Sequence, residues 1–161
     1  MTPVKRNKPV LILSNWQNKV TLGAAFTASA AKAVSAIFAA ERCARGGSVN
    51  VCVMDDSRIR AVNRLYLGHN YATDVISFNL QGRKAGAMEA EIAVSAQTAA
   101  RNASKYGNST EKELLVYIIH GVLHAMGYDD RTETERALMQ KKTDAVIDQL
   151  FPAKKKRKAR E

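Results

Sequence analysis

Two histidines one helical turn apart provide the most recognisable chemistry in this chain. His120 and His124 lie in a predominantly apolar stretch, and residues four apart project from the same face of a helix, so both imidazoles can bind one ion. Gly127 suits a left-handed turn that ends the helix and brings Asp129 and Asp130 back toward that face. The segment therefore predicts a metal site with two helical ligands and a third after the turn.

The alternative interpretation is a pair of ordinary core histidines, which is the commoner role of a single His on an apolar face. Two neighbouring imidazoles in apolar surroundings need hydrogen-bond partners or shifted pKa values. A divalent cation satisfies both rings at once, and zinc in particular binds imidazole and carboxylate. Because two of the three histidines of the chain are here, we expect one divalent ion per chain, zinc or another metal.

Two blocks of the sequence resemble a known family. The stretch 120–129, which reads His-Gly-x-Leu-His-x-x-Gly-Tyr-Asp, is similar to the signature of the YbeY family of metal-dependent endoribonucleases, also called rRNA maturation factors. Upstream, Asn63-x-x-Tyr66 and the run Thr-Asp-Val-Ile-Ser-Phe at 73–78 resemble the family's other characteristic block. The likeness covers about residues 10–150 as an order of elements, and the two blocks together are far more specific than a lone pair of histidines.

The resemblance implies a ligand set and an activity. His120 and His124 would be two metal ligands, and Asp130 stands where the family normally has a third His. A carboxylate still suits zinc, but its charge reduces the Lewis acidity of the ion and makes harder cations more competitive. The implied function is single-strand-specific hydrolysis of RNA in rRNA maturation and ribosome quality control, with rRNA and the ribosome or its proteins as partners.

Two other positions depart from the family pattern. The Arg that usually follows the Tyr of the upstream block, and that would suit a scissile phosphate, is replaced by Leu67. Arg64, His69 and Arg58 are candidate substitutes. The family's Gly-Asp-Ile on the following strand reads Ala-Glu-Ile, with Glu91 at its centre. Glu91 could orient water or a ligand, or be an ordinary solvated residue. The catalytic residues stay open, with Glu91, His69 and Arg64 as candidates.

Two other function classes fit parts of the pattern. Metallopeptidases of the metzincin type have similar ligand spacing, but they place a Glu directly after the first His as general base. Here that residue is Gly121, which argues against proteolysis. The second class is a non-catalytic, ribosome-associated RNA-binding protein with a structural metal. Three protein ligands favour catalysis, because structural zinc sites usually have four.

Length and composition indicate one domain in the cytoplasm. With 161 residues, 46% of them hydrophobic, the chain can bury a core of its own. No run approaches the length of a membrane span, and residues 1–6 lack the apolar region of a signal peptide. Cys43 and Cys52 are too few for a disulfide framework, and we expect both to be reduced.

The net charge of +10 is concentrated at the ends of the chain. Residues 153–161 contribute +5 and residues 1–9 contribute +3, so the body carries only +2. We expect a basic N-terminal segment at 1–9, a metal-dependent endoribonuclease-like domain at 10–152 and a disordered basic tail at 153–161. The tail could bind RNA phosphates with salt-sensitive affinity. It could instead increase solubility, and it also imitates a nuclear localisation signal.

Periodicity and capping residues predict an α+β fold. We expect a small mixed β-sheet of about four strands, flanked by helices, around a central buried metal-bearing helix. Thr110 with Glu113, and Thr132 with Glu135, have the spacing of capping boxes that begin helices. The expected strands are 10–14, 49–54, 75–80 and 89–94. The expected helices are 25–42, 55–66, 95–106, 110–126 and 132–150, with a loop at 81–87.

Overall fold

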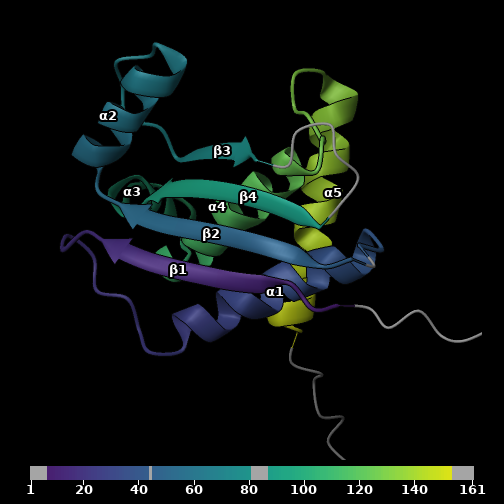
Figure 1. Cartoon of the computed structure of the whole chain (residues 1–161). Coiled ribbons are helices and arrows are strands. Elements are labelled where there is room, and N and C mark those ends of the chain that lie inside the picture. The colour runs from purple at the N-terminus through teal and green to yellow at the C-terminus, as the bar shows by residue number, and fades with distance from the viewer. Residues whose placement is uncertain (1–6, 44, 81–86, 154–161) are drawn as a thin grey trace, which may run out of the picture.

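The computed structural model describes residues 7–43, 45–80 and 87–153, which form the expected α+β fold (Figure 1). Most of the predicted basic N-terminal segment, loop 81–87 and basic tail therefore lies outside the described residues. The strands are β1 (Val10–Trp16), β2 (Gly47–Met54), β3 (Val75–Asn79) and β4 (Met88–Ser95). The helices are α1 (Phe26–Ala40), α2 (Asp56–Leu67), α3 (Ala96–Tyr106), α4 (Thr110–Ala125) and α5 (Glu133–Leu150). Each element that the sequence predicted is present, with its ends within two residues of the expected bounds.

The four strands form one sheet in the order β1-β2-β4-β3. β1, β2 and β4 run parallel, and β3 pairs antiparallel with β4, so the sheet is mixed as predicted. Along β2, buried Val49, Val51 and Val53 alternate with less buried residues. This period of two shows that one face of the sheet is completely covered and the other only partly.

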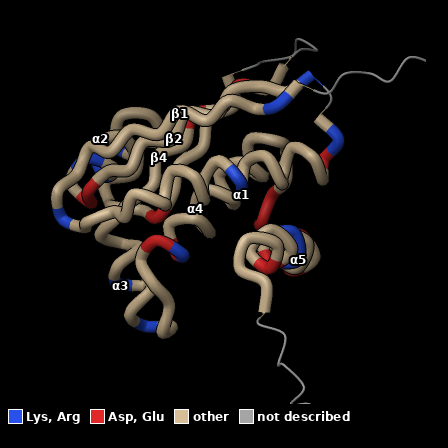
Figure 2. Tube along the Cα trace, turned by 90° about the horizontal axis from the view of Figure 1, so that it is seen from below, with Lys and Arg blue, Asp and Glu red and all other residues tan. Residues whose placement is uncertain are grey.

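Helices cover the two faces of the sheet unequally. On one face, which we call the α4 face, α1 and α4 pack against the strands, and α5 lies beyond them (Figure 2). On the opposite face, the α2 face, Ile59 of α2 packs with Ile76 and Ala93 in a second, smaller hydrophobic cluster. Because α4 lies between the sheet, α1, α3 and α5, it is apolar around most of its circumference. No helix in the described ranges is long and apolar enough to cross a membrane.

Gly121 lets α4 approach the sheet closely. A Cβ atom at this position would lie 2.7 Å from Cγ2 of Ile92 and 3.1 Å from Cγ2 of Val75, so a larger residue would force the helix away from the strands. Two hydrogen bonds from β3 hold the helix there. Ser77 Oγ donates to the Gly121 carbonyl at 2.6 Å, and Asn79 Nδ2 donates to the Ala125 carbonyl at 2.7 Å.

One of the two predicted capping boxes is wrong. α4 is capped by Ser109, whose side chain accepts from the Lys112 N–H, and Thr110 is already helical. Two successive hydroxyl residues can each provide the cap, and the backbone takes the extended conformation at the first of them. The predicted box at Thr132 and Glu135 is confirmed at the start of α5.

Candidate metal centre

α4 ends in a turn that reverses the chain. Gly127 has a φ of 99°, its N–H donates to the His124 carbonyl at 2.9 Å, and the Tyr128 N–H donates to the Leu123 carbonyl at 3.1 Å. This pair of bonds is the Schellman arrangement, in which a left-handed residue terminates a helix. The turn predicted at Gly127 is therefore confirmed, and it places the next residues beside the last turn of α4.

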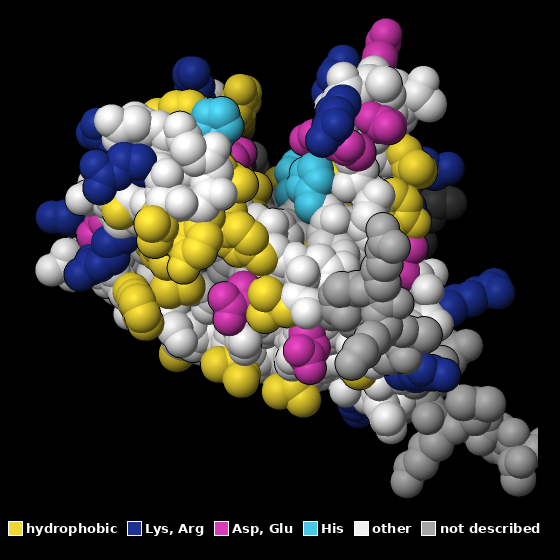
Figure 3. Space-filling model, turned by 45° about the horizontal axis from the view of Figure 1, so that its top comes forward, with side chains coloured by type: hydrophobic (Ala, Val, Ile, Leu, Met, Phe, Trp, Pro, Cys, Tyr) yellow, Lys and Arg dark blue, Asp and Glu magenta, His cyan; other side chains and the backbone are white. Residues whose placement is uncertain are grey.

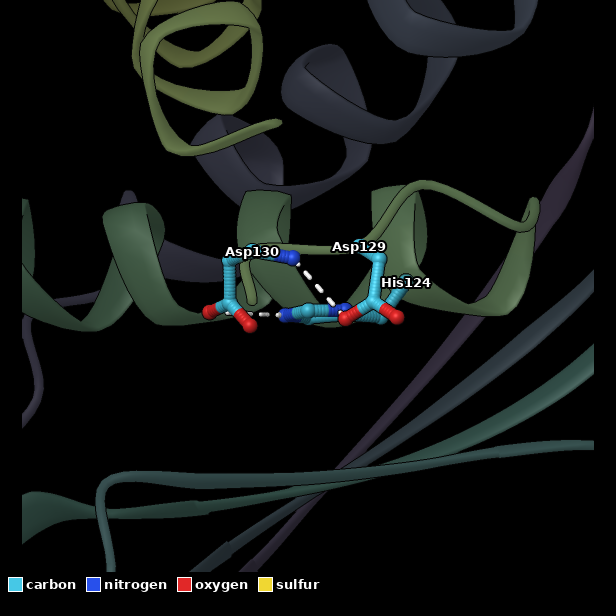
Figure 4. A group of neighbouring side chains, drawn as sticks. All are labelled: His124, Asp129 and Asp130. Carbon is cyan, nitrogen blue, oxygen red and sulfur yellow. Dashed lines mark hydrogen bonds and ion pairs between the residues drawn. The ribbon is translucent and has the colours of Figure 1, made fainter. Parts of the chain in front are cut away.

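Three side chains that could hold a metal lie together at this turn. One nitrogen of His124 and one carboxylate oxygen each of Asp129 and Asp130 all lie within 4.8 Å of one another. The distance from His124 Nε2 to Asp130 Oδ2 is 3.5 Å. Figure 4 shows both carboxylates beside the imidazole, with Asp130 next to Nε2. Of the three predicted ligands, the structure thus brings His124 and Asp130 together and adds Asp129.

The ring of His124 is oriented by its own loop. Its Nδ1 lies 3.0 Å from the Tyr128 carbonyl oxygen. Because a carbonyl oxygen can only accept, Nδ1 carries a proton, and in the neutral form of the ring the lone pair is on Nε2. Histidines that bind metals are commonly fixed through the other ring nitrogen in this way.

Tyr128 is held in turn by two residues from distant parts of the chain. Its hydroxyl donates to Glu41 Oε2 at 2.6 Å. Lys142 Nζ donates to Glu41 Oε1 at 2.6 Å and lies 4.6 Å from the centroid of the Tyr128 ring. Burial raises the pKa of Glu41, but the hydrogen bonds from Lys142 and Tyr128 and the Lys142 charge outweigh it and lower the pKa below its ordinary value. Glu41 therefore remains ionised at neutral pH.

His120 lies one turn before His124, outside the group of three. Its Nε2 atom is buried and has no hydrogen-bond partner among the residues described. Burial first, and then the nearby charge of His124, lower the pKa of His120, so that the ring is neutral near pH 7. A buried nitrogen without a partner is costly. The donor atoms present are therefore compatible with a divalent ion, which would give this atom a partner.

The two aspartates differ in their surroundings. Asp129 Oδ2 lies 3.1 Å from Arg131 Nε, and its Oδ1 accepts from the backbone N–H of Asp130. The Asp130 carboxylate instead faces His124. Arg136 fixes the loop by donating to the carbonyls of Asp130 and Arg131. Asp129 is thus paired with an exposed arginine, whereas the Asp130 carboxylate faces the imidazole, which makes Asp130 the better placed acidic ligand.

The upstream block of the family resemblance positions β3 against α4. Asn63 Nδ2 donates to the Tyr71 carbonyl at 2.9 Å and so holds the loop that leads from α2 to β3. Asp74 Oδ1 accepts from the Val75 N–H at 2.8 Å and from Thr73 Oγ1 at 3.1 Å, at the point where β3 begins. These residues fix the start of the strand whose Ser77 binds α4.

The remaining candidates from the sequence lie elsewhere. Ile92 contacts α4 at Gly121, so its neighbour Glu91 projects from the opposite, α2 face. Arg58 Nη1 donates to the Asp55 carboxylate and to the Trp16 carbonyl, each at 2.7 Å, and is therefore engaged at the start of α2.

Arg64 and Leu67 lie in the last turn of α2, and His69 follows the end of the helix. Leu67 is the last residue of the helix and is 50% exposed, and the His69 ring lies 5.4 Å from that of Tyr71. Figure 3 shows histidine side chains on both sides of a notch between this part of the molecule and the end of α4. Sequence reasoning missed Glu41 and Lys142, which no local pattern links to Tyr128.

Comparisons with known proteins agree with this geometry. The family model described as Endoribonuclease YbeY matches residues 12–151. The chain is 36% identical over 148 residues to the Endoribonuclease YbeY of Pelotomaculum thermopropionicum, covering 88% of this chain and 97% of the relative. It is 31% identical over 138 residues to that of Carboxydothermus hydrogenoformans, covering 86% and 95%. The solution structure of TM1509 from Thermotoga maritima, 23% identical, has the same fold, with a TM-score of 0.62 over 94% of this chain and 100% of that chain. The chain therefore belongs to the YbeY family of endoribonucleases.

Proposed function

We propose that this protein hydrolyses phosphodiester bonds of single-stranded RNA with a divalent ion, most favourably zinc, held by His120, His124 and Asp130. The observation that carries the proposal is the buried Nε2 of the neutral His120, which has no hydrogen-bond partner within the described ranges. It lies one helical turn from a second imidazole, whose Nε2 faces a carboxylate. Imidazole and carboxylate are the donor types that zinc prefers in sites with an open position.

When bound, a divalent ion supplies Lewis acidity that polarises a phosphoryl oxygen and makes a water molecule easier to deprotonate. The Tyr128 carbonyl keeps His124 in the tautomer with its lone pair on Nε2. Asp130 contributes negative charge to the site. Three protein ligands leave space for substrate or water. The general base stays open. His69 remains a candidate, whereas Glu91 projects from the opposite, α2 face of the sheet. Arg64 is the candidate to contact the scissile phosphate in place of the Arg that Leu67 replaces.

The family resemblance extends the proposal to a cellular role. We place the protein in the cytoplasm, in rRNA maturation and ribosome quality control, with rRNA and the ribosome or its proteins as partners. In this proposal residues 10–152 are the nuclease domain, 1–9 a basic segment and 153–161 an RNA-binding arm. A chain that lacks 153–161 should then bind RNA with a weaker dependence on salt concentration, because fewer counterions are released.

Leu67 gives a second candidate function some support. If the clamp for the scissile phosphate is lost with the usual Arg, the protein could bind RNA at the ribosome without cutting it, with a structural metal. A metallopeptidase is not compatible with the packing of α4. The position after the first His is where Gly121 touches the sheet, so it has no space for the Glu of those enzymes.

The decisive experiment is elemental mass spectrometry on the purified protein and on His124→Ala, together with cleavage of a single-stranded RNA by the same samples. His69→Ala is the matched control for metal content alone, because it removes a histidine outside the ligand group. Stoichiometric zinc and cleavage that both depend on His124 would support the nuclease. Bound metal without cleavage would favour the structural alternative, and absence of metal from freshly purified protein would refute the proposed centre.

A further inference from the structure

A large hollow lies on the α2 face of the sheet. It has a volume of about 1010 Å³ and is bordered by β1, β2, β3, β4 and α2. Three aromatic side chains, Trp16, Tyr66 and Phe78, form part of its lining. Tyr66 and Phe78 meet edge to face with ring centroids 5.5 Å apart. Trp16 and Tyr66 are 61% and 65% exposed. Concave surfaces that combine exposed aromatic rings with a few polar groups are typical of ligand sites.

The charge of the lining restricts the ligand. Among the described residues that border the hollow, Glu91 has the one charged side chain. Its register partner on β2 is Asn50, whose Oδ1 is buried without a hydrogen-bond partner in the part of the chain described. A carboxylate repels phosphate but accepts hydrogen bonds from amino groups, such as the exocyclic amines of cytosine and adenine. The acceptor oxygens of Glu91 and Asn50 are therefore suited to contact the base of a nucleotide rather than its phosphate backbone.

The hollow adjoins the candidate metal centre across one strand. Ser77 and Asn79 of β3 bind the backbone of α4 next to the ligand turns, while Phe78 between them lines the hollow. β3 is at the edge of the sheet. An RNA strand that has a phosphate at the metal centre can therefore pass around this edge and place a neighbouring base on the α2 face.

We propose that the hollow binds unpaired nucleobases of the RNA substrate, which stack on Tyr66, Phe78 and Trp16 and donate an amino hydrogen to Glu91. This inference rests on the proposed function, in which RNA is the substrate. It specifies that the protein recognises the bases of the strand. A base in a duplex has its faces stacked and its pairing edge occupied, so the hollow selects single strands. Stacking tolerates any base, whereas Glu91 favours cytosine and adenine over uracil.

The single Trp of the chain is a built-in probe, because Trp16 borders the hollow. Its fluorescence should be titrated with oligocytidylate, oligouridylate, an abasic strand of equal length and an RNA duplex, and strand integrity checked afterwards by electrophoresis. We expect quenching by the two single strands, tighter for cytidylate, and little by the abasic strand or the duplex. Equal quenching by the abasic strand and oligocytidylate would overturn the proposal.

Matched variants locate the site. Tyr66→Ala should weaken binding of oligocytidylate roughly 5- to 150-fold, the range for loss of one stacked base. Tyr106→Ala removes a similarly exposed Tyr on α3, outside the hollow, and should bind as wild type does. Glu91→Gln should abolish the preference for cytidylate, unlike Glu89→Gln two residues earlier on β4. Equal affinity of Tyr66→Ala and Tyr106→Ala would refute the site.

The same titration on His124→Ala separates this inference from the proposed catalysis. If His124→Ala loses metal and cleavage but still shows base-dependent quenching, both hold. If metal and cleavage prove absent from the wild type while quenching persists, the metal-centred catalysis fails and the base site stands. Quenching that depends on protein concentration and not on RNA would identify a second copy of the chain as the occupant and would overturn the inference.

Discussion

The Nδ1 atom of His124 lies 3.0 Å from the carbonyl oxygen of Tyr128, four residues further along the chain. This contact joins the last turn of α4 to the loop that carries both aspartates. The hydroxyl of the same tyrosine binds Glu41, and Glu41 binds Lys142 of α5. The orientation of one ligand is therefore connected to packing between α1 and α5.

Removal of the Tyr128 hydroxyl should test this connection. Tyr128→Phe keeps the carbonyl and the ring but deletes the bond to Glu41, and we expect a loss of about 1.5–3 kcal/mol in the free energy of unfolding, as for other hydrogen bonds to charged groups. Zinc affinity should fall by less than the roughly 10–100-fold that follows loss of a direct partner of a ligand. Urea denaturation and competition with a chelator measure the two effects. Tyr106→Phe is the control, and an unchanged zinc affinity in Tyr128→Phe would show that the hydroxyl serves stability alone.

The local features of this site could be predicted from the sequence. The spacing of His120 and His124, the turn at Gly127 and the bounds of the helices follow from periodicity and from residues with strong conformational preferences. Each depends on neighbours within a few positions. The choice between Thr110 and Ser109 as the cap of α4 was wrong, because adjacent hydroxyl residues are nearly equivalent in sequence.

Features that depend on distant residues could not be predicted. Glu41 is separated from Tyr128 by 87 positions and from Lys142 by 101, and no periodic pattern records such contacts. The strand order β1-β2-β4-β3 is likewise a property of the packed sheet. The ion pair between Asp129 and Arg131 depends on side-chain orientation within the loop.

Gly121→Ala should destabilise the protein through packing. The added methyl group would lie 2.7 Å from Ile92, and because Ser77 and Asn79 tie the helix to β3, α4 cannot shift freely. We expect a loss of about 1–3 kcal/mol in the free energy of unfolding, as for other overpacked sites. Ile92→Ala removes the Cγ2 atom that the added methyl group would meet. In the double variant with Ile92→Ala, the loss should therefore be smaller than the sum of the losses in the two single variants, and additive losses would argue against the clash.

Gly127 and Gly107 offer a matched pair for the role of the turn. Both have positive φ values, 99° and 69°, and a Cβ at either position would meet no atom within 4 Å. Substitution by Ala should therefore cost about 1–2 kcal/mol of stability at each position through backbone strain alone. Only Gly127→Ala should also reduce zinc affinity, because Asp130 follows that turn. Comparable zinc affinity in the two variants would show that the turn at Gly127 is not needed for metal binding.

His120 should make the metal-free protein sensitive to pH. Its pKa in the folded state lies below the ordinary value of 6.5, chiefly through burial, so the unfolded chain binds more protons as the pH falls below 6.5. The contribution of this group to the free energy of unfolding is fully present above pH 6.5. It decreases as the pH falls toward the lowered pKa of the folded state. Urea denaturation of chelator-treated protein between about pH 7.5 and 5.5 should show this decrease. His120→Gln should show less of this decrease. An identical pH dependence in His120→Gln and wild type would mean that the ring is not held neutral by its surroundings.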